Sequence, residues 1–203
     1  MKIICIGRNY AEHAAELNSA VPKEPVFFIK PETALMRAGY PFFIPAFSSN
    51  IHYEVELVLK ITRVGKNIQE RFAHRYYHEI GVGIDFTARD IQNQCKDEGL
   101  PWEKAKAFDG SAPVSQFVSL NSLRDDENIR FSLQKNGTVV QTGFSNDMIF
   151  SFNHLIAYVS QFVTLKTGDF LFTGTPAGVG SVQAGDLLEA FLEDKKMLHI
   201  PVK

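Results

Sequence analysis

The sequence has few cysteines and lacks any long apolar segment, and both absences limit its class. Cys5 and Cys95 are the only cysteines among 203 residues, and they lie in neither a CxxC motif nor a cluster with histidine. We therefore expect neither a disulfide framework nor a structural zinc site, and a reducing compartment, the cytoplasm or an organelle matrix, fits best. No apolar run approaches the ~20 residues that span a membrane, and the first residues do not resemble a secretory signal.

The sequence also lacks an excess of charge of one sign. It carries 21 basic and 23 acidic residues, with a formal net charge of -2. Without a basic segment, neither nucleic acid nor a membrane surface is an expected partner. The chain is 45% hydrophobic and shows no linker-like segment, so we expect one domain over residues 1–203 that binds a small molecule.

Short apolar segments separated by turn residues predict a β-rich α+β fold. Alternation of apolar and polar residues over 51–61 predicts a strand with one apolar face. Further strands are predicted at residues 2–6, 26–29 and 81–84. Helices are predicted at residues 10–17, 67–80, 88–97 and 153–162. Turn residues such as Asn136-Gly137 indicate short strands in the second half.

Three carboxylates form a candidate metal site. Glu54 and Glu56 are two apart on a predicted strand, so their side chains leave the same face with Cα atoms roughly 6–7 Å apart. Asp85 follows the next predicted strand, where functional groups often project. Like charges side by side repel unless a cation lies between them, and such oxygen donors suit Mg²⁺ or Mn²⁺, with Ca²⁺ also able to bind. Alternatively, Glu54 and Glu56 bind no metal and simply lie on the solvent-exposed face of a sheet.

His13 and Glu16 form a candidate base pair. They are three residues apart on a predicted helix and lie on one face, where a carboxylate orients an imidazole and raises its basicity. Such a pair can draw a proton from water. The alternative is a surface pair that contributes a few tenths of a kcal/mol.

The segment 173–180 is a glycine-rich turn between apolar segments. It lacks the GK[ST] of a nucleotide-binding loop. The backbone amides around Gly174, with the hydroxyl of Thr175, could bind a carboxylate instead. A plain tight connection fits this pattern equally well.

Taken together, these motifs resemble the fumarylacetoacetate hydrolase family, in particular its short single-domain branch that includes the acylpyruvases. The resemblance follows family order through nearly the whole chain. It rests on Gly7-Arg8-Asn9-Tyr10 with His13, Phe28-Ile29-Lys30-Pro31, Tyr53-Glu54-Val55-Glu56-Leu57, Gly83-Ile84-Asp85-Phe86-Thr87-Ala88-Arg89-Asp90 with Gln92, Leu100-Pro101-Trp102, Ala105-Lys106-Ala107-Phe108-Asp109-Gly110, and Thr173-Gly174-Thr175-Pro176-Ala177-Gly178-Val179-Gly180.

The resemblance implies a mixed β-sandwich roll of the type of that family's C-terminal domain, with the active site at one mouth and assembly as a homodimer. It places the metal ligands at Glu54, Glu56 and Asp85. It places the base dyad at His13 and Glu16, and the catalytic lysine at Lys106. The remaining implied substrate contacts are Arg8, Lys30, Gln92, Gly174 and Thr175.

The main function expected from this resemblance is metal-dependent hydrolysis of a carbon–carbon bond in an acylpyruvate, a small anionic 2-keto acid. His13 would activate water and Lys106 would offset charge as the bond breaks. Two alternatives share the site: oxaloacetate decarboxylation, and isomerisation or hydration of a 2-hydroxyhepta-2,4-diene-1,7-dioate-like compound. A metal-binding homologue without catalytic activity is the non-enzymatic alternative.

Overall fold

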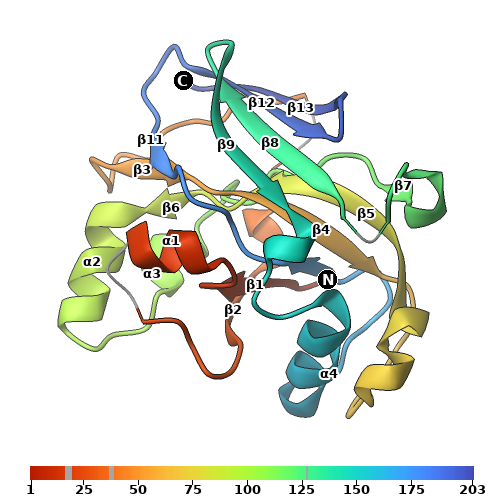
Figure 1. Cartoon of the computed structure of the whole chain (residues 1–203). Helices are drawn as coiled ribbons and strands as arrows, with labels where there is room; N and C mark the ends of the chain where they lie inside the picture. The colour runs from red at the N-terminus through yellow and green to blue at the C-terminus, as the bar shows by residue number, and fades with distance from the viewer. Residues whose placement is uncertain (17–19, 37–38, 127) are drawn as a thin grey trace.

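The computed structural model describes residues 1–203 except 17–19, 37–38 and 127, and the described residues form three β-sheets (Figure 1). The largest sheet has six strands, in the order β2-β1-β10-β4-β5-β7. These strands are β1 (Ile3–Gly7), β2 (Val26–Lys30), β4 (Val55–Ile61), β5 (Tyr77–Ile84), β7 (Val118–Ser119) and β10 (Phe170–Phe172). Of the described strands in this sheet, β1 and β10 pair in parallel and the other neighbours are antiparallel, so the sheet is mixed.

Two smaller antiparallel sheets complete the sandwich. The four-stranded sheet has the order β13-β12-β8-β9, and the three-stranded sheet has the order β11-β3-β6. Their strands are β3 (Ile51–Tyr53), β6 (Thr87–Ala88), β8 (Arg130–Lys135), β9 (Thr138–Phe144), β11 (Gly180–Ser181), β12 (Leu187–Leu192) and β13 (Lys195–Pro201). The β-rich α+β class expected from the sequence is confirmed.

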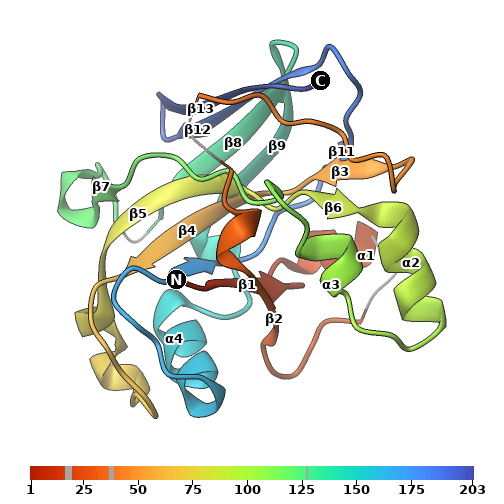
Figure 2. The same ribbon diagram turned by 180° about the vertical axis from the view of Figure 1, so that it is seen from behind.

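Short helices lie at opposite ends of the sheets. The α-helices are α1 (Ala11–Glu16), α2 (Arg89–Asp97), α3 (Glu103–Lys106) and α4 (Phe152–Phe162), and the 3₁₀ helices are η1 (Glu32–Ala34), η2 (Glu70–Tyr76), η3 (Leu120–Ser122) and η4 (Ser145–Asp147). α1, α2 and α3 gather beside β3 and β6, whereas α4 packs against η2 on the other side (Figures 1 and 2).

The predicted strand over 51–61 is interrupted and is buried on both faces. It divides at Glu54 into β3 and β4, which belong to different sheets. One face of β4 carries Leu57 and Leu59 into the main core, as the alternation predicts. The opposite face, with Glu56 and Val58, is also buried, because a second hydrophobic cluster covers it. The expectation of a single apolar face was therefore wrong.

Two of the four helix predictions agree with the structure to within one residue. These two are α2 and α4. In the region predicted as a helix at 10–17, the structure places α1 at 11–16, and Leu17 lies outside the described residues. The predicted helix over 67–80 was wrong, because η2 ends at Tyr76 and β5 begins at the next residue. Apolar residues four apart fit a strand period of two as well as a helical period, and Ile80 pairs with Leu59 in the sheet.

Other local predictions also held. Asn136 and Gly137 have φ values of 53° and 79° and join β8 to β9, as an Asn-Gly hairpin requires. Cys5 and Cys95 are both free and buried, and burial raises the pKa of the Cys5 thiol.

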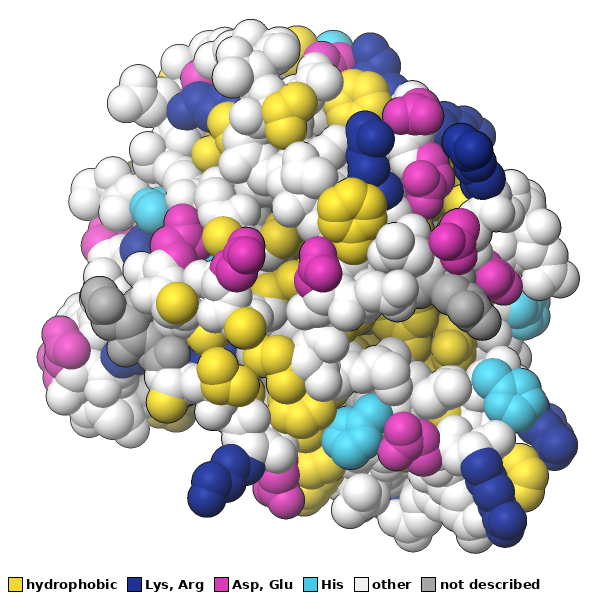
Figure 3. Space-filling view, viewed as in Figure 1, with side chains coloured by type: hydrophobic (Ala, Val, Ile, Leu, Met, Phe, Trp, Pro, Cys, Tyr) yellow, Lys and Arg dark blue, Asp and Glu magenta, His cyan; other side chains and the backbone are white. Residues whose placement is uncertain are grey.

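The surface carries charges of both signs. On the face shown in Figure 3, acidic and basic side chains are interspersed, with hydrophobic side chains visible between them. Among the described helices, none is long and apolar enough to cross a membrane.

Substitution of Gly83 by alanine tests the close packing around β5. A Cβ at this position would lie 2.7 Å from the Phe172 ring and 2.9 Å from Cγ2 of Val58. Overpacking of this kind is expected to lower the free energy of unfolding by about 1–3 kcal/mol, measured by urea denaturation. His78→Ala, an exposed site on the same strand, is the control and should change it by less than about 0.5 kcal/mol. Equal effects of the two substitutions would contradict the packing argument.

Candidate metal centre and active site

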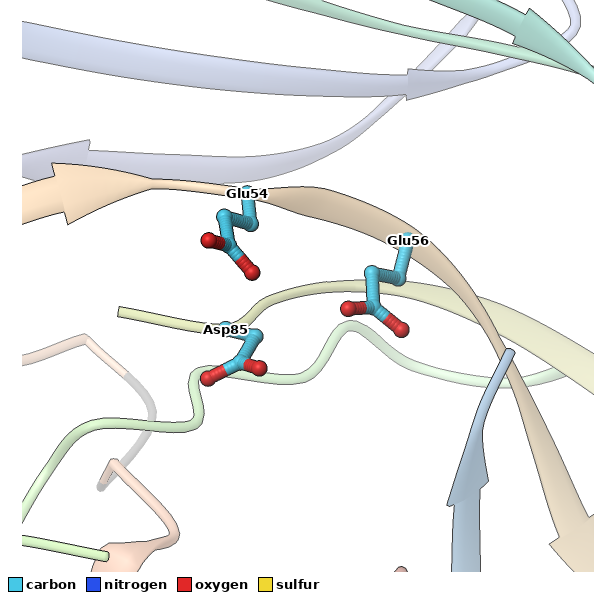
Figure 4. Close-up of side chains that lie close together, drawn as sticks. All are labelled: Glu54, Glu56 and Asp85. Carbon is cyan, nitrogen blue, oxygen red and sulfur yellow. The ribbon is translucent and has the colours of Figure 1, made fainter. Parts of the chain in front are cut away.

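Three carboxylates from two segments converge at the end of the central strands (Figure 4). Glu54 lies between β3 and β4, Glu56 lies in β4, and Asp85 directly follows β5. Ligand oxygens of the three groups lie within 4.8 Å of one another, and all three residues are buried. The structure therefore brings together the three residues that the sequence suggested as metal ligands.

The pairing of β4 with β5 determines where these carboxylates meet. In this antiparallel pair Glu56 lies opposite Gly83. Just beyond the ladder, the backbone N–H of Asp85 donates to the carbonyl of Glu54 at 2.8 Å. This bond holds the two acidic residues side by side on adjacent segments.

The glycine-rich segment 173–180 positions the third carboxylate. The N–H of Gly174 donates to Oε2 of Glu56 at 2.6 Å. Gly174 has a φ of +103°, and a Cβ there would come within 2.7 Å of the Cβ of Asn9. Glycine is therefore required for this approach. The sequence suggested that this amide binds substrate, whereas in the structure it binds a candidate metal ligand.

Lys106, the last residue of α3, points its ammonium group between two of the carboxylates. Nζ donates to Glu54 Oε2 and to Asp85 Oδ2, both at 2.8 Å, and to Thr87 Oγ1 at 2.6 Å. Burial lowers the pKa of the ammonium group, but the charges of Asp85 and Glu54 outweigh burial and raise it. Lys106 therefore stays charged at neutral pH.

A second buried cation, Arg89, was not among the sequence-predicted site residues. It is the first residue of α2, and its guanidinium forms an ion pair with Oε1 of Glu54. It also donates to Oε1 of Gln92 at 2.6 Å, which orients this predicted substrate contact. The signal in the sequence was the spacing of Arg89 and Gln92, which are three apart and so share one face of a helix.

The pKa values of Glu54 and Glu56 are shifted in opposite directions. Burial and the neighbouring Asp85 raise the pKa of Glu56 well above its ordinary 4.5. Burial also acts to raise the pKa of Glu54, but Lys106 and Arg89 outweigh it and lower this pKa. The positive groups thus favour the charged form of Glu54, whereas the charged form of Glu56 is disfavoured.

One further observation shows that the cluster fits a divalent cation. Oδ1 of Asp85 is buried and accepts no hydrogen bond within the described chain. Nζ of Lys30 forms an ion pair with this oxygen at 2.7 Å, while its hydrogen bonds go to the carbonyl and the hydroxyl of Ser111, both at 2.9 Å, and to the carbonyl of Phe86 at 3.4 Å. A carboxylate oxygen that accepts no hydrogen bond, beside a Glu56 whose charged form is disfavoured, suits a hard cation such as Mg²⁺ or Mn²⁺.

The predicted base pair forms at the same site. His13 of α1 is 5% exposed, and its Nδ1 lies 3.2 Å from Oε2 of Glu16. Glu16 is fixed in turn by the N–H of Gly178, at 3.2 Å to Oε1 and 3.3 Å to Oε2. The partly buried pair is therefore more constrained than the alternative of a solvated surface pair.

The carboxylates line a pocket together with most of the other predicted site residues. The predicted residues that line it are Arg8, His13, Gln92, Lys106 and Thr175. The other predicted residues contact groups of the site instead. Lys30 forms an ion pair with Asp85, the N–H of Gly174 donates to Glu56, and Glu16 contacts the ring of His13. The pocket also contains Lys96 and Trp102, which the sequence did not single out as site residues.

The fold and this acidic pocket define the class of small β-rich domains that can hold a divalent cation beside a base and a buried lysine. The chain belongs to the fumarylacetoacetate (FAA) hydrolase C-terminal family, whose profile matches residues 2–202. The expected family membership is therefore confirmed.

Individual relatives are similar over almost the whole chain. Oxaloacetate tautomerase YcgM of Escherichia coli (strain K12) is 47% identical over 188 residues, which cover 92% of this chain and 86% of the relative. The mitochondrial oxaloacetate tautomerase FAHD1 of Rattus norvegicus is 44% identical over 201 residues, or 99% of this chain and 91% of the relative. Known members of the family are thus enzymes.

A solved structure supports the fold and the type of site. The crystal structure of fumarylpyruvate hydrolase from Pseudomonas aeruginosa, in complex with Mn²⁺ and pyruvate, superposes with a TM-score of 0.93. It is 35% identical, and the match covers 100% of this chain and 89% of the hydrolase. A relative of the same fold therefore binds a divalent metal ion and a 2-keto acid.

Glu56→Gln is expected to have opposite effects on stability with and without a metal ion. In the metal-free protein the neutral amide is no longer repelled by Asp85, so the melting temperature should stay equal or rise. Removal of an anionic ligand should weaken Mn²⁺ binding by at least ~10-fold. Thermal melts of EDTA-treated protein with increasing MnCl₂ measure both effects.

The control is Glu103→Gln, which changes an exposed glutamate outside the pocket. It should leave the Mn²⁺-dependent rise in melting temperature as in the unmodified protein. An identical response to Mn²⁺ in the two variants would exclude Glu56 as a ligand.

The pH dependence of stability follows from the raised pKa of Glu56. Above pH 4.5, the ordinary value, the unfolded chain releases a proton that the metal-free folded chain retains. The contribution of Glu56 to the free energy of unfolding should therefore decrease as the pH rises through the raised pKa. Urea denaturation of EDTA-treated protein at several pH values measures this slope, which should be smaller in Glu56→Gln. An equal slope in both proteins would assign the effect to other groups.

Proposed function

We propose that the protein is a divalent-metal-dependent enzyme that acts on oxaloacetate, interconverts its keto and enol forms, and can release carbon dioxide from it. The proposal rests on the buried carboxylate triad with a charged Lys106 in the same pocket. The names of the relatives FAHD1 and YcgM support oxaloacetate as the substrate. They favour the oxaloacetate alternative over acylpyruvate hydrolysis, which was the main expectation from the sequence.

Both reactions on oxaloacetate place negative charge on the same oxygen. In tautomerisation a proton leaves C3 and another joins the C2 oxygen. In decarboxylation the C3–C4 bond breaks and its electron pair moves toward that oxygen. A divalent cation, when bound, supplies Lewis acidity to the 2-keto group.

Lys106 is the side chain best suited to stabilise this developing charge. Its ammonium group remains protonated, is held by Glu54 and Asp85, and faces the pocket. A preorganised positive group that is itself buried stabilises an enolate more than it stabilises a neutral ketone. This difference in binding is what accelerates the reaction.

His13 is placed to move the proton at C3. Because Nδ1 faces Glu16, the other ring nitrogen, Nε2, is free for a substrate in the pocket that His13 lines. Glu16 orients the ring and stabilises its charged form once a proton has been accepted. Gln92, oriented by Arg89, adds a polar contact for the substrate.

Acylpyruvate hydrolysis is the second candidate function, and the pair of His13 and Glu16 favours it. Hydrolysis needs a base that deprotonates water, whereas decarboxylation does not. The structural relative named fumarylpyruvate hydrolase is in keeping with this chemistry. Assembly as a homodimer remains a prediction from the family resemblance.

His13→Ala distinguishes these reactions. Tautomerisation and hydrolysis should each fall by ~10²–10⁴-fold, because both depend on a base, while decarboxylation should retain much of its rate. Enol absorbance of oxaloacetate measures tautomerisation, and pyruvate release from oxaloacetate and from acetylpyruvate measures the other two. His74→Ala, which changes an exposed histidine, is the control and should retain all activities.

The outcome for the unmodified protein decides the proposal. It should process oxaloacetate faster than acetylpyruvate in the presence of Mg²⁺ or Mn²⁺ and lose activity with EDTA. Metal-independent activity, or an unchanged tautomerisation rate in His13→Ala, would overturn the mechanism.

A further inference from the structure

Two positive side chains in the pocket have no anionic partner among the described residues. Arg8 and Lys96 both line it and are half-buried. Within the described chain, neither forms a hydrogen bond or an ion pair, although Lys96 has a cation–π contact. By contrast, the cations around the triad are all paired: Arg89 with Glu54, Lys30 with Asp85, and Lys106 with both carboxylates.

The charges of the inner cluster balance without Arg8 and Lys96. Even with all three carboxylates ionised, as metal binding requires, they face three cations there, so the two remaining positive groups are an excess. A divalent cation in the triad would increase this excess further. An anion with more than one negative charge is therefore the complementary ligand for the pocket as a whole.

Lys96 is held in place at the pocket wall. Its Nζ lies 5.8 Å from the centroid of the Trp102 ring, within the range of a cation–π contact. Burial and the positive charges of Arg89 and Arg8 lower the pKa of Lys96, so the group lies among like charges. A bound anion would remove this repulsion.

Arg8 is also fixed, through its backbone. Its φ of 61° lies in the left-handed region that residues other than glycine adopt only rarely. The next residue, Asn9, is fully buried and bonds to two distant segments: Nδ2 donates to the carbonyls of Thr173 and Phe150, at 2.8 and 3.1 Å, and Oδ1 accepts from the N–H of Phe150. The chain at Arg8 therefore leaves β1 in a defined direction along the pocket wall.

We propose that Arg8 and Lys96 bind the second carboxylate of a dicarboxylic 2-keto acid and make the enzyme prefer such substrates over monocarboxylic ones. This inference rests on the proposed function and adds the residues that set its substrate preference. The triad side of the pocket takes the 2-keto acid end, and the unpaired cations take the distal carboxylate. Charge-assisted hydrogen bonds from arginine and lysine are strong and specific for such a group.

The first test compares substrates in Lys96→Met. The ratio of kcat/KM for oxaloacetate to kcat/KM for acetylpyruvate should fall about tenfold, since a lost bond to a charged group has roughly this effect. Lys96→Arg should restore most of the ratio. Arg8→Asn, which removes the charge but tolerates the left-handed backbone, should lower the ratio to a similar extent.

The matched control is Lys104→Met, which removes an exposed lysine of α3 that does not line this pocket. Its ratio should equal that of the unmodified protein. Equal losses for both substrates in Lys96→Met, or a ratio that falls as far in Lys104→Met, would overturn the proposal.

A binding measurement separates this inference from the proposed reaction. Malate and 2-hydroxybutyrate share a 2-hydroxy acid end, and malate carries a carboxylate where the other has a methyl group. Calorimetric titration of Mn²⁺-loaded protein should show tighter binding of malate, and Lys96→Met should weaken malate about tenfold and 2-hydroxybutyrate by less than about twofold.

The two hypotheses then fail in different ways. If the protein converts no 2-keto acid, the proposed function fails, while the preference for malate still tests the subsite. If oxaloacetate is converted but malate and 2-hydroxybutyrate bind equally, the subsite is wrong and the proposed function stands.

Discussion

The structure depends on the burial of three carboxylates beside three cations at the end of the central strands. Each charge would be costly alone in such an environment. Among the described residues, Glu54, Asp85 and the three cations each have an opposite charge within hydrogen-bond distance, whereas Glu56 does not. The compensation is uneven. Glu54 has both Lys106 and Arg89, whereas Glu56 has only the N–H of Gly174 beside a like charge. This imbalance would favour binding of a cation at the cluster.

The fold serves mainly to bring these charges together. β4 supplies Glu56, the end of β5 supplies Asp85, and two short helices supply Arg89 and Lys106. Glu56, Asp85 and Lys106 are far apart in sequence, so the register of β4 with β5 and the packing of α3 bring them together. The site is therefore a product of tertiary packing, and its precision depends on the rigidity of the sheet.

The sequence identified Glu54 and Glu56 as candidate metal ligands because a strand period of two puts them on one face. It predicted α2 and α4 to within one residue, but it misassigned the segment 67–80, where the spacing of apolar residues fits both a helical period and a strand period. It did not single out Arg89 or Lys96 as site residues. Arg89 reaches Glu54 across 35 positions, and such a contact leaves no mark in local spacing. The family resemblance supplied Lys106, which spacing alone would also have missed.

The segment 173–180 bonds to two parts of the site at once. Its Gly174 amide binds Glu56, and its Gly178 amide binds Glu16. A single stretch of backbone thus sets the positions of both a candidate cation ligand and the partner of the base. Any displacement of this stretch alters both together, so the geometry of proton transfer and the geometry of cation binding are mechanically coupled.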